Sequence, residues 1–333
     1  MDAKISKKRL NHLLSYDWVK ILIVALAAVL VWNLIFTMTE TRRLPSQAVS
    51  VMNYTGAKFG ASAETTLNDT LFDGRFSHEV LETECLDATR AGEQYTHTLL
   101  ESYFTTDECD IVVVANVNDP ESEQEVDGEK KYLTYAQEFI GGYAAYVVDA
   151  SAFFDGMRSY LNGYYTNGYA DASSLDKQKI EDDFRARIKS NQDKRYKTED
   201  VIKTVVDLEY ERIEKYRQAL LNVEEYLQKG YLRLDLVGVD VADSSGQTVR
   251  FERTVLNICP DEDLMGNIKK EYYYEQQTTD EATGGTLTVA AAKDMSFVFV
   301  ETPNMDSNFY YETVLYIDTL VQKYCTALQP QAQ

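Results

Sequence analysis

The feature that most constrains this chain is the apolar run from Trp18 to Met38. Between Ile21 and Met38 only Asn33 and Thr37 are polar. These eighteen residues would rise by roughly 27 Å as a helix at about 1.5 Å each, which is close to the ~30 Å of hydrocarbon in a bilayer. The run therefore predicts a transmembrane helix, and it determines where the rest of the chain lies.

The charges that flank the apolar run predict its orientation. Five basic residues precede it or lie at its start, whereas two follow closely, and the more basic flank stays in the cytoplasm. We therefore predict a single-pass protein of the cell membrane with a cytoplasmic N-terminus and an extracellular C-terminal domain. A cleaved signal peptide is the alternative, but the apolar stretch continues beyond its alanines and no A-x-A pair follows Met38. The basic residues are Lys4, Lys7, Lys8, Arg9 and Lys20 on the first side, and Arg42 and Arg43 on the second.

Residues 44–333 are strongly acidic. They hold 26 of the 33 lysines and arginines and 51 of the 54 aspartates and glutamates, which gives a net charge of −25. A field of this sign repels nucleic acid and favours cationic ligands or divalent counter-ions. A generic solvated surface is the simpler interpretation, because the segment closest to a calcium loop, 116–129, has Pro120 and Glu121 where that loop needs a ligand and a glycine. We predict no metal, no cofactor and no nucleic-acid partner.

All four cysteines follow the apolar run. An even number of cysteines outside the membrane permits two disulfides, in any of three connectivities. Their spacing fits no C-x-x-C metal motif, which argues against zinc. We prefer pairs of Cys85 with Cys109 and of Cys259 with Cys325, because each pair flanks one predicted packed unit; four free buried thiols are the alternative.

The first part of the extracellular domain alternates between strand and helix patterns. Residues 48–54 alternate in polarity, residues 75–83 fit a second strand, and residues 110–116 form an apolar run rich in β-branched side chains. Tyrosines and leucines at helical spacing predict a helix over 88–104. Because the last strand is fully apolar, this order indicates a right-handed βαβ unit in a parallel sheet that is covered on both faces.

The middle of the chain is predicted to be helical, and the last third returns to strands. A long amphipathic helix should begin after an N-cap at Thr198 and end at a C-cap, Gly230; packing against the preceding helix is favoured over a coiled-coil dimer. Ser173 and Asp176 form a capping-box pattern at the start of that preceding helix, which runs to about residue 190. Further helices are predicted over 131–154 and 308–327, and strands over 232–241, 249–258, 286–291 and 295–300.

The element order in residues 45–120, carried by FSHEVLET, YTHTLLESY and DECDIVVVAN, resembles the first lobe of type 2 periplasmic-binding-protein-like domains. The chain also resembles uncharacterised single-span ectoproteins of Gram-positive anaerobes. The resemblance implies an α/β fold with two lobes and a parallel or mixed sheet, here with a helical insertion and a membrane anchor. The predicted parts are a cytoplasmic basic tail (1–17), a transmembrane signal anchor (18–38), a tether (39–47), a first α/β lobe (48–150), a helical region (151–230), a second α/β part with a closing helix (231–328) and a frayed tail (329–333).

The chain carries no recognisable catalytic motif. It has no G-x-S-x-G, H-E-x-x-H or phosphate-binding glycine loop. The two histidines after the apolar run, His78 and His97, are better explained as ordinary core or surface residues. We therefore predict that the protein is not an enzyme, with an unrecognised hydrolase as the alternative.

The one locally unusual patch is residues 159–169, SYLNGYYTNGY, where tyrosines flank two Asn-Gly turns. Tyrosines beside glycine turns are typical of ligand-contact loops, although chance clustering explains them equally in a chain with 24 tyrosines. Ligands of open α/β sheets lie beyond the carboxyl ends of the strands, which also nominates Tyr54 and Asn116. The candidate ligand-binding residues are Tyr54, Asn116, Tyr160, Asn162, Tyr164, Tyr165 and Tyr169.

Two functional hypotheses follow. The first is a membrane-anchored extracellular module that captures a small solute, such as a peptide or sugar, for an adjacent transporter. The second is an interaction or scaffold ectodomain whose long helical pair docks another envelope protein and binds no small molecule. Thermal-shift screening of the ectodomain against solutes distinguishes them, because a ligand at 100 times its dissociation constant adds about 2.7 kcal/mol of stability.

Overall fold

We describe the protein from a computed structural model. The predicted tail, most of the tether and the end of the frayed tail lie outside the described residues. Residues 1–43 and 44–333 form two compact units, which are described separately. The structure describes residues 18–39, 47–59, 61–88, 93–119, 122, 124–126, 129–191, 195–242, 247–274, 276–279, 286–289, 294–302 and 310–329.

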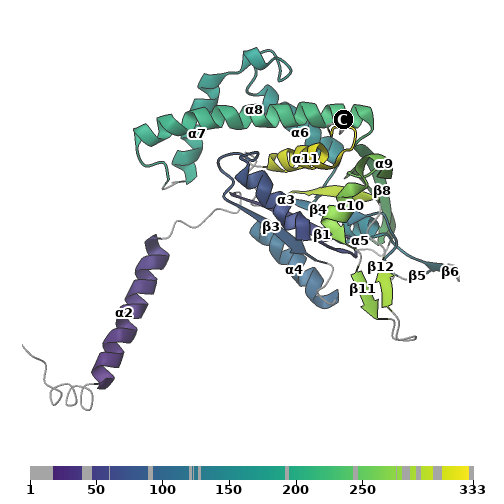
Figure 1. Cartoon of the computed structure of the whole chain (residues 1–333), viewed down its shortest axis with the longest axis horizontal. Coiled ribbons are helices and arrows are strands. Elements are labelled where there is room, and N and C mark those ends of the chain that lie inside the picture. The colour runs from purple at the N-terminus through teal and green to yellow at the C-terminus, as the bar shows by residue number, and fades with distance from the viewer. Residues whose placement is uncertain are drawn as a thin grey trace, which may run out of the picture. The chain divides into compact units, whose positions relative to one another are not determined.

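Helix α2, Trp18–Thr39, contains the predicted membrane span (Figure 1). Among the described residues it is the one helix that is long and apolar enough to cross a membrane, over the window Trp18–Ile35, and no part of that window is buried. A signal sequence near an N-terminus meets the same criteria of length and composition. The structure therefore shows an apolar N-terminal helix with the dimensions of a membrane span.

The second unit is built around a seven-stranded mixed sheet. Its strands follow the order β3-β1-β4-β13-β9-β8, and β7 pairs with one end of β13. Strand β1 is parallel to both β3 and β4, which confirms the predicted parallel pairing, whereas the pairs from β4 to β8 are antiparallel. The strands are β1 Ala48–Tyr54, β3 Glu82–Asp87, β4 Ile111–Ala115, β7 Val147–Val148, β8 Arg233–Ala242, β9 Thr248–Asn257 and β13 Met295–Val300.

Three further ladders of two strands lie outside the main sheet. The first pairs β2 (Lys58–Phe59) with β10 (Tyr273–Tyr274). The others are the hairpins of β5 (Gln124–Val126) with β6 (Glu129–Lys131) and of β11 (Gln276–Thr279) with β12 (Thr286–Val289).

Helices cover both faces of the main sheet, so the unit has three layers. All five residues of β4 are buried, and alternate residues point to opposite faces, which is why this strand is apolar throughout. Val112 and Val114 face the layer of α4 (Glu93–Thr106) and α5 (Tyr135–Gly142). Ile111 and Val113 face the larger helical layer. This layer consists of α3 (Ala61–Phe72), α6 (Ala150–Asn162), α8 (Glu199–Lys229) and α11 (Glu312–Tyr324). Attached to it are α7 (Lys177–Asn191), the short helices α9 (Glu262–Met265) and α10 (Asn267–Tyr272), and the 3₁₀ turn η2 (Ala172–Ser174).

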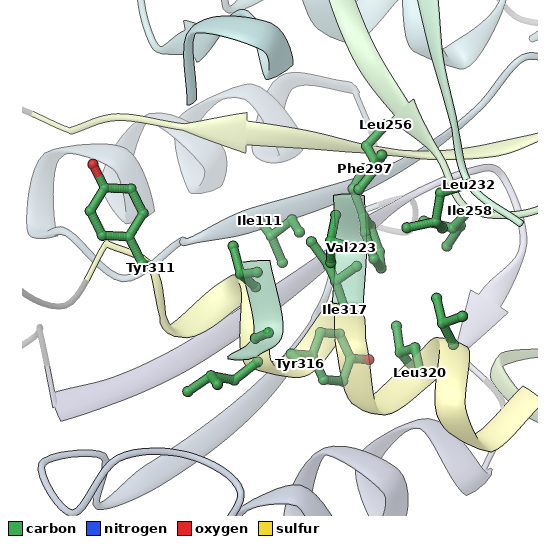
Figure 2. Packing of buried hydrophobic residues seen from close by; sticks show 14 of the residues in the cluster. Ile111, Val223, Leu232, Leu256, Ile258, Phe297, Tyr311, Tyr316, Ile317 and Leu320 are labelled. Carbon is green, nitrogen blue, oxygen red and sulfur yellow. The ribbon is translucent and has the colours of Figure 1, made fainter. Parts of the chain in front are cut away.

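The larger layer contains the main core. Figure 1 shows α8 alongside α11, and Figure 2 shows Val223 of α8 and Ile317 of α11 close to Ile111 and Phe297 of the sheet. All four side chains are almost completely buried. The long helix ends as its sequence predicts. The Thr198 hydroxyl accepts a bond from the Val201 N–H at 3.4 Å, and Gly230 has a φ of +75°, which favours glycine.

Several predicted elements need correction. The strand expected over 75–83 is wrong in its first part, because 75–81 is a loop and β3 begins at Glu82. Helix α3 lies between β1 and β3, where the resemblance implies a helix, but its residues give no clear helical pattern, since its threonines, Asn68 and Asp69 are weak helix formers. The helical stretch expected over 131–154 is interrupted by β7 between α5 and α6.

The two lobes implied by the resemblance are not separate in this unit. Strand β13 of the predicted second part pairs with β4 of the predicted first lobe, from Met295 beside Ala115 to Phe299 beside Ile111. The antiparallel pair joins the two parts edge to edge, and residues 44–333 form one compact unit. The mixed sheet and the helical insertion agree with the prediction.

The four cysteines are free thiols in the structure, so neither preferred disulfide is formed. Cys109, Cys259 and Cys325 are buried, and Cys85 is partly exposed on β3. Burial raises the pKa of the Cys85 thiol to about 12, which keeps it protonated at neutral pH. The structure thus has free thiols, the alternative to disulfides, of which three are buried.

Candidate functional site

The loop between α3 and β3, residues 73–81, holds a buried carboxylate that joins distant parts of the chain. Glu79 is 2% exposed and accepts hydrogen bonds from three side chains. Arg187 Nη2 lies 3.0 Å from Oε1, Arg195 Nη2 lies 2.5 Å from Oε2, and the Tyr196 hydroxyl lies 3.1 Å from Oε1. Because Arg187 belongs to α7 and the other two donors precede α8, Glu79 fastens the α7–α8 connection to this loop.

A second buried carboxylate extends this ion network into α8. Glu209 accepts from Arg187 Nη2 at 2.6 Å and from Arg212 Nη2 at 2.9 Å. Burial alone would raise the pKa of Glu209, but the charges of Arg212 and Arg187 lower it below its usual value. Arg212 also donates to the Tyr160 hydroxyl at 3.1 Å, which connects the network to α6.

The same loop is tied to α11. The Ser77 N–H donates to Glu312 at 3.2 Å, and the Tyr216 hydroxyl donates to the same carboxyl group at 2.6 Å. Burial raises the pKa of Glu312, since few charges compensate it there. The loop is therefore fixed by polar bonds to α7, α8 and α11.

His78 completes the only group of three ligand atoms in the described part of the chain that could hold a metal ion. Its Nε2 lies 3.4 Å from Glu209 Oε1 and 3.7 Å from Glu79 Oε1. Arg187 Nη2, however, is bonded to these same two oxygens, so a guanidinium already fills the cation position. Burial lowers the pKa of His78 and keeps the ring neutral. Three arginines around two carboxylates make this a structural ion network, and we assign no metal to it.

A pocket of about 250 Å³ opens beside the network, and we call it the α3–α8 pocket. Its charged residues come from α8, and its apolar walls come from α3, the loop and α8. Phe72, next to the wall residue Leu71, is 80% exposed, and the wall residue Leu208 is 36% exposed. The pocket is lined by Leu71, Gly74, Phe76, Ser77, His78, Val80, Leu208, Glu211, Arg212 and Lys215.

A second hollow lies at the C-terminal end of α8. It has a volume of about 580 Å³ and is more open to solvent. Its walls are formed by Leu227, Leu232, Leu234 and Pro260, and its charged residues are Lys229, Arg233 and Asp261. Lys229 and Arg233 are already paired, with Glu225 and Asp235.

The tyrosine segment predicted to contact a ligand is packed against α8. Tyr164 and Tyr165 are buried, and the Tyr165 hydroxyl donates to Glu214 at 2.8 Å. The Tyr169 hydroxyl donates to Glu224 at 3.0 Å, and the Tyr169 N–H donates to Asn162 Oδ1 at 3.1 Å. Together with Tyr160, which accepts from Arg212, these side chains hold α6 and α8 together. Their polar ends bond within the chain, and ligand contact by this segment stays a prediction.

The other two candidates lie elsewhere. Tyr54 is half-buried and packs against Phe139 of α5, with ring centroids 5.4 Å apart. Burial raises its pKa, so it stays neutral. Asn116 is exposed, and its N–H donates to the Asp294 carbonyl at 3.2 Å. Tyr54 packs with the α4–α5 layer and Tyr164 with the α8 layer, so the sheet separates these candidates and the structure does not bring them together.

Sequence reasoning missed the ion network and the α3–α8 pocket. Glu79 and its partners Arg187 and Arg195 are 108 and 116 residues apart in the sequence. No local pattern predicts such a pairing, and in so acidic a chain a single glutamate carries no signal. The only local indication of the ion network is the basic cluster around Arg195, whose polar sequence predicts no more than a connection between two helices.

The fold and the site define a mixed α/β domain that has helices on both faces of its sheet, a buried ion network and a small pocket, and that follows an apolar N-terminal helix in the sequence. Comparison with protein-family models, with curated proteins and with solved structures finds no match for this chain.

Proposed function

We propose that this protein is a membrane-anchored ectodomain that binds another envelope protein through the surface around the α3–α8 pocket. The observation that carries this proposal is a pocket of side-chain size with an exposed apolar wall residue, Leu208, and an exposed Phe72 next in the chain to the wall residue Leu71. Pockets for drug-sized ligands usually enclose about 300–1,000 Å³. At about 250 Å³ the α3–α8 pocket is smaller, whereas the exposed Phe72 and Leu208 supply the kind of apolar anchor that protein interfaces use.

The ion network supports this proposal by making the surface rigid. Loop 73–81 is joined to α7, α8 and α11 through Glu79 and Glu312, so the pocket walls are fixed before any partner arrives. A preorganised surface loses less conformational entropy on binding. The network is thus a support for the interface and takes no direct part in it.

Location is the second part of the proposal. An uncleaved α2 places residues 44–333 outside the cell membrane, with the N-terminus in the cytoplasm. A partner is then met near the outer membrane face, which suits an envelope protein or a transporter component. Capture of a small solute is the second candidate function, because the hollow at the C-terminal end of α8, at about 580 Å³, has the size of a ligand site.

Site-specific photocrosslinking in intact membranes tests the proposal. The full-length chain carries a photoreactive amino acid at Phe72 in one variant and at Val249 in a control, where the native side chain is 50% exposed on β9. We expect one discrete crosslinked protein from position 72 and none from position 249. Equal crosslinking at both positions, or none at either together with a thermal shift by a small solute, contradicts an interface at this pocket.

A further inference from the structure

Lys215 is held at the α3–α8 pocket in an unusual way. Its ammonium group donates to the carbonyl oxygens of Gly74 at 2.6 Å and Phe76 at 2.9 Å. An ammonium carries three N–H donors, so one donor is left after these two bonds. Within the part of the chain that the structure describes, no carboxylate forms an ion pair with it. The loop thus fixes a cation in place without neutralising it.

This cation lies among other groups of positive character in an otherwise acidic domain. Arg212 and the imidazole of His78 line the same pocket, although Arg212 is paired with Glu209. Glu211, one turn before Lys215, is the only carboxylate among the lining residues, and it is exposed. A partly desolvated ammonium next to apolar walls attracts a carboxylate more strongly than one in open water does.

The volume of the α3–α8 pocket and the chemistry of its walls restrict the kind of group that can bind in it. A volume of about 250 Å³ leaves room for one residue. The walls formed by Leu71, Phe76, Val80 and Leu208 accept an apolar side chain, while Lys215 accepts a carboxylate. The C-terminal residue of a peptide carries an apolar side chain and a free carboxylate on the same Cα atom. Capture of a terminal carboxylate is a known mode of peptide recognition.

We infer that the α3–α8 pocket binds the free C-terminal carboxylate of a partner protein that ends in an apolar residue, with Lys215 as the cation. This inference rests on the proposed function and specifies the chemistry of the partner. Leu208 and Phe72 contact the terminal side chain and the residue before it. Glu211 repels the carboxylate and limits the affinity.

Fluorescence anisotropy tests the inference. The full-length chain in lipid nanodiscs is titrated against an N-terminally fluorescein-labelled peptide, Gly-Gly-Ser-Leu, with a free C-terminus or a C-terminal amide. We expect the acid to bind at least tenfold more tightly than the amide. Lys215→Met should reduce binding of the acid to the level of the amide, and Glu211→Gln should strengthen it. Lys203→Met, at an exposed position of the same helix, is the matched control and should leave the affinity unchanged.

A second variant keeps the test decisive if Lys215→Met disturbs loop 73–81. Leu208→Glu introduces a carboxylate at an exposed position of the pocket wall, so it should abolish binding of the acid without unfolding the domain. Equal affinities for acid and amide, or no saturable binding of the acid, overturn the inference. Because crosslinking at Phe72 does not depend on the peptide, a discrete crosslink without acid-selective peptide binding refutes the carboxylate chemistry and leaves the interface intact.

Discussion

Glu79→Gln should destabilise the extracellular domain by about 3 kcal/mol. Glu79 is buried and joins two arginines and a tyrosine, and breaking a buried ion pair from one side typically costs about 3–5 kcal/mol. The lower value applies here, because Arg187 and Arg195 keep 10% and 26% of their side-chain surface exposed and regain some solvation. For a domain of this size, a loss of about 3 kcal/mol lowers the melting temperature by about 6 °C.

Circular dichroism melting of the full-length chain measures this shift, and hydrogen exchange locates it. Protection should fall first in loop 73–81 and near Arg195, where the carboxylate makes its bonds. Glu225→Gln is the control, because it removes an exposed i,i+4 pair with Lys229 whose loss costs about 0.5 kcal/mol or less. A melting temperature for Glu79→Gln within about 1 °C of the control would show that the network does not support the loop.

Three further predictions concern a partly buried acid, the cysteines and the core. Burial raises the pKa of Asp110 to about 7, above its unfolded value of about 4, so the folded state binds the extra proton and loses stability as pH rises from 4 to 7. Asp110→Asn keeps the acceptor for the Ser50 N–H at 2.7 Å, so in urea titrations at pH 8 it should be more stable than the unmodified chain, by at most about 4 kcal/mol, and a lower stability contradicts the assignment. Alkylation of the denatured, unreduced chain should modify all four cysteines, as measured by mass spectrometry, whereas a chain with two disulfides would have no modified cysteine. Leu220→Ala should cost about 2–5 kcal/mol in the same urea assay because its side chain, on α8, is fully buried in the main core, and a cost below 1 kcal/mol would contradict that packing.

Elements whose pattern is purely local could be predicted from the sequence. The alternation of residues 48–54 and the apolar run of 110–116 each predict a strand, and the capping residues Thr198 and Gly230 predict the ends of α8. Loop 73–81 was misread in part as a strand, since its alternation of polar and apolar residues reflects long-range bonds and not a pleat. Phe76 and Val80 enter the core, while Ser77 and Glu79 meet partners from distant helices.

The candidate site was less predictable than the fold. The tyrosine segment resembled a recognition loop because its composition suits exposure, yet Tyr165 and Tyr169 find glutamates 49 and 55 residues later in the chain. The α3–α8 pocket combines α3, loop 73–81 and α8, and only the tertiary fold brings these segments together. The structure does not confirm two lobes, and the pairing of β13 with β4 that joins the two predicted parts is not encoded in either strand alone.

The affinity of the crosslinked partner for three forms of the full-length chain tests the central claim most directly. Isothermal titration calorimetry in nanodiscs would compare the unmodified chain with Phe72→Ala and Val249→Ala. Both substitutions remove an exposed apolar side chain, so neither should disturb folding. We predict that Phe72→Ala weakens binding at least tenfold, as expected for an interface anchor, and that Val249→Ala leaves it unchanged. Equal affinities for all three forms would contradict an interface at the α3–α8 pocket.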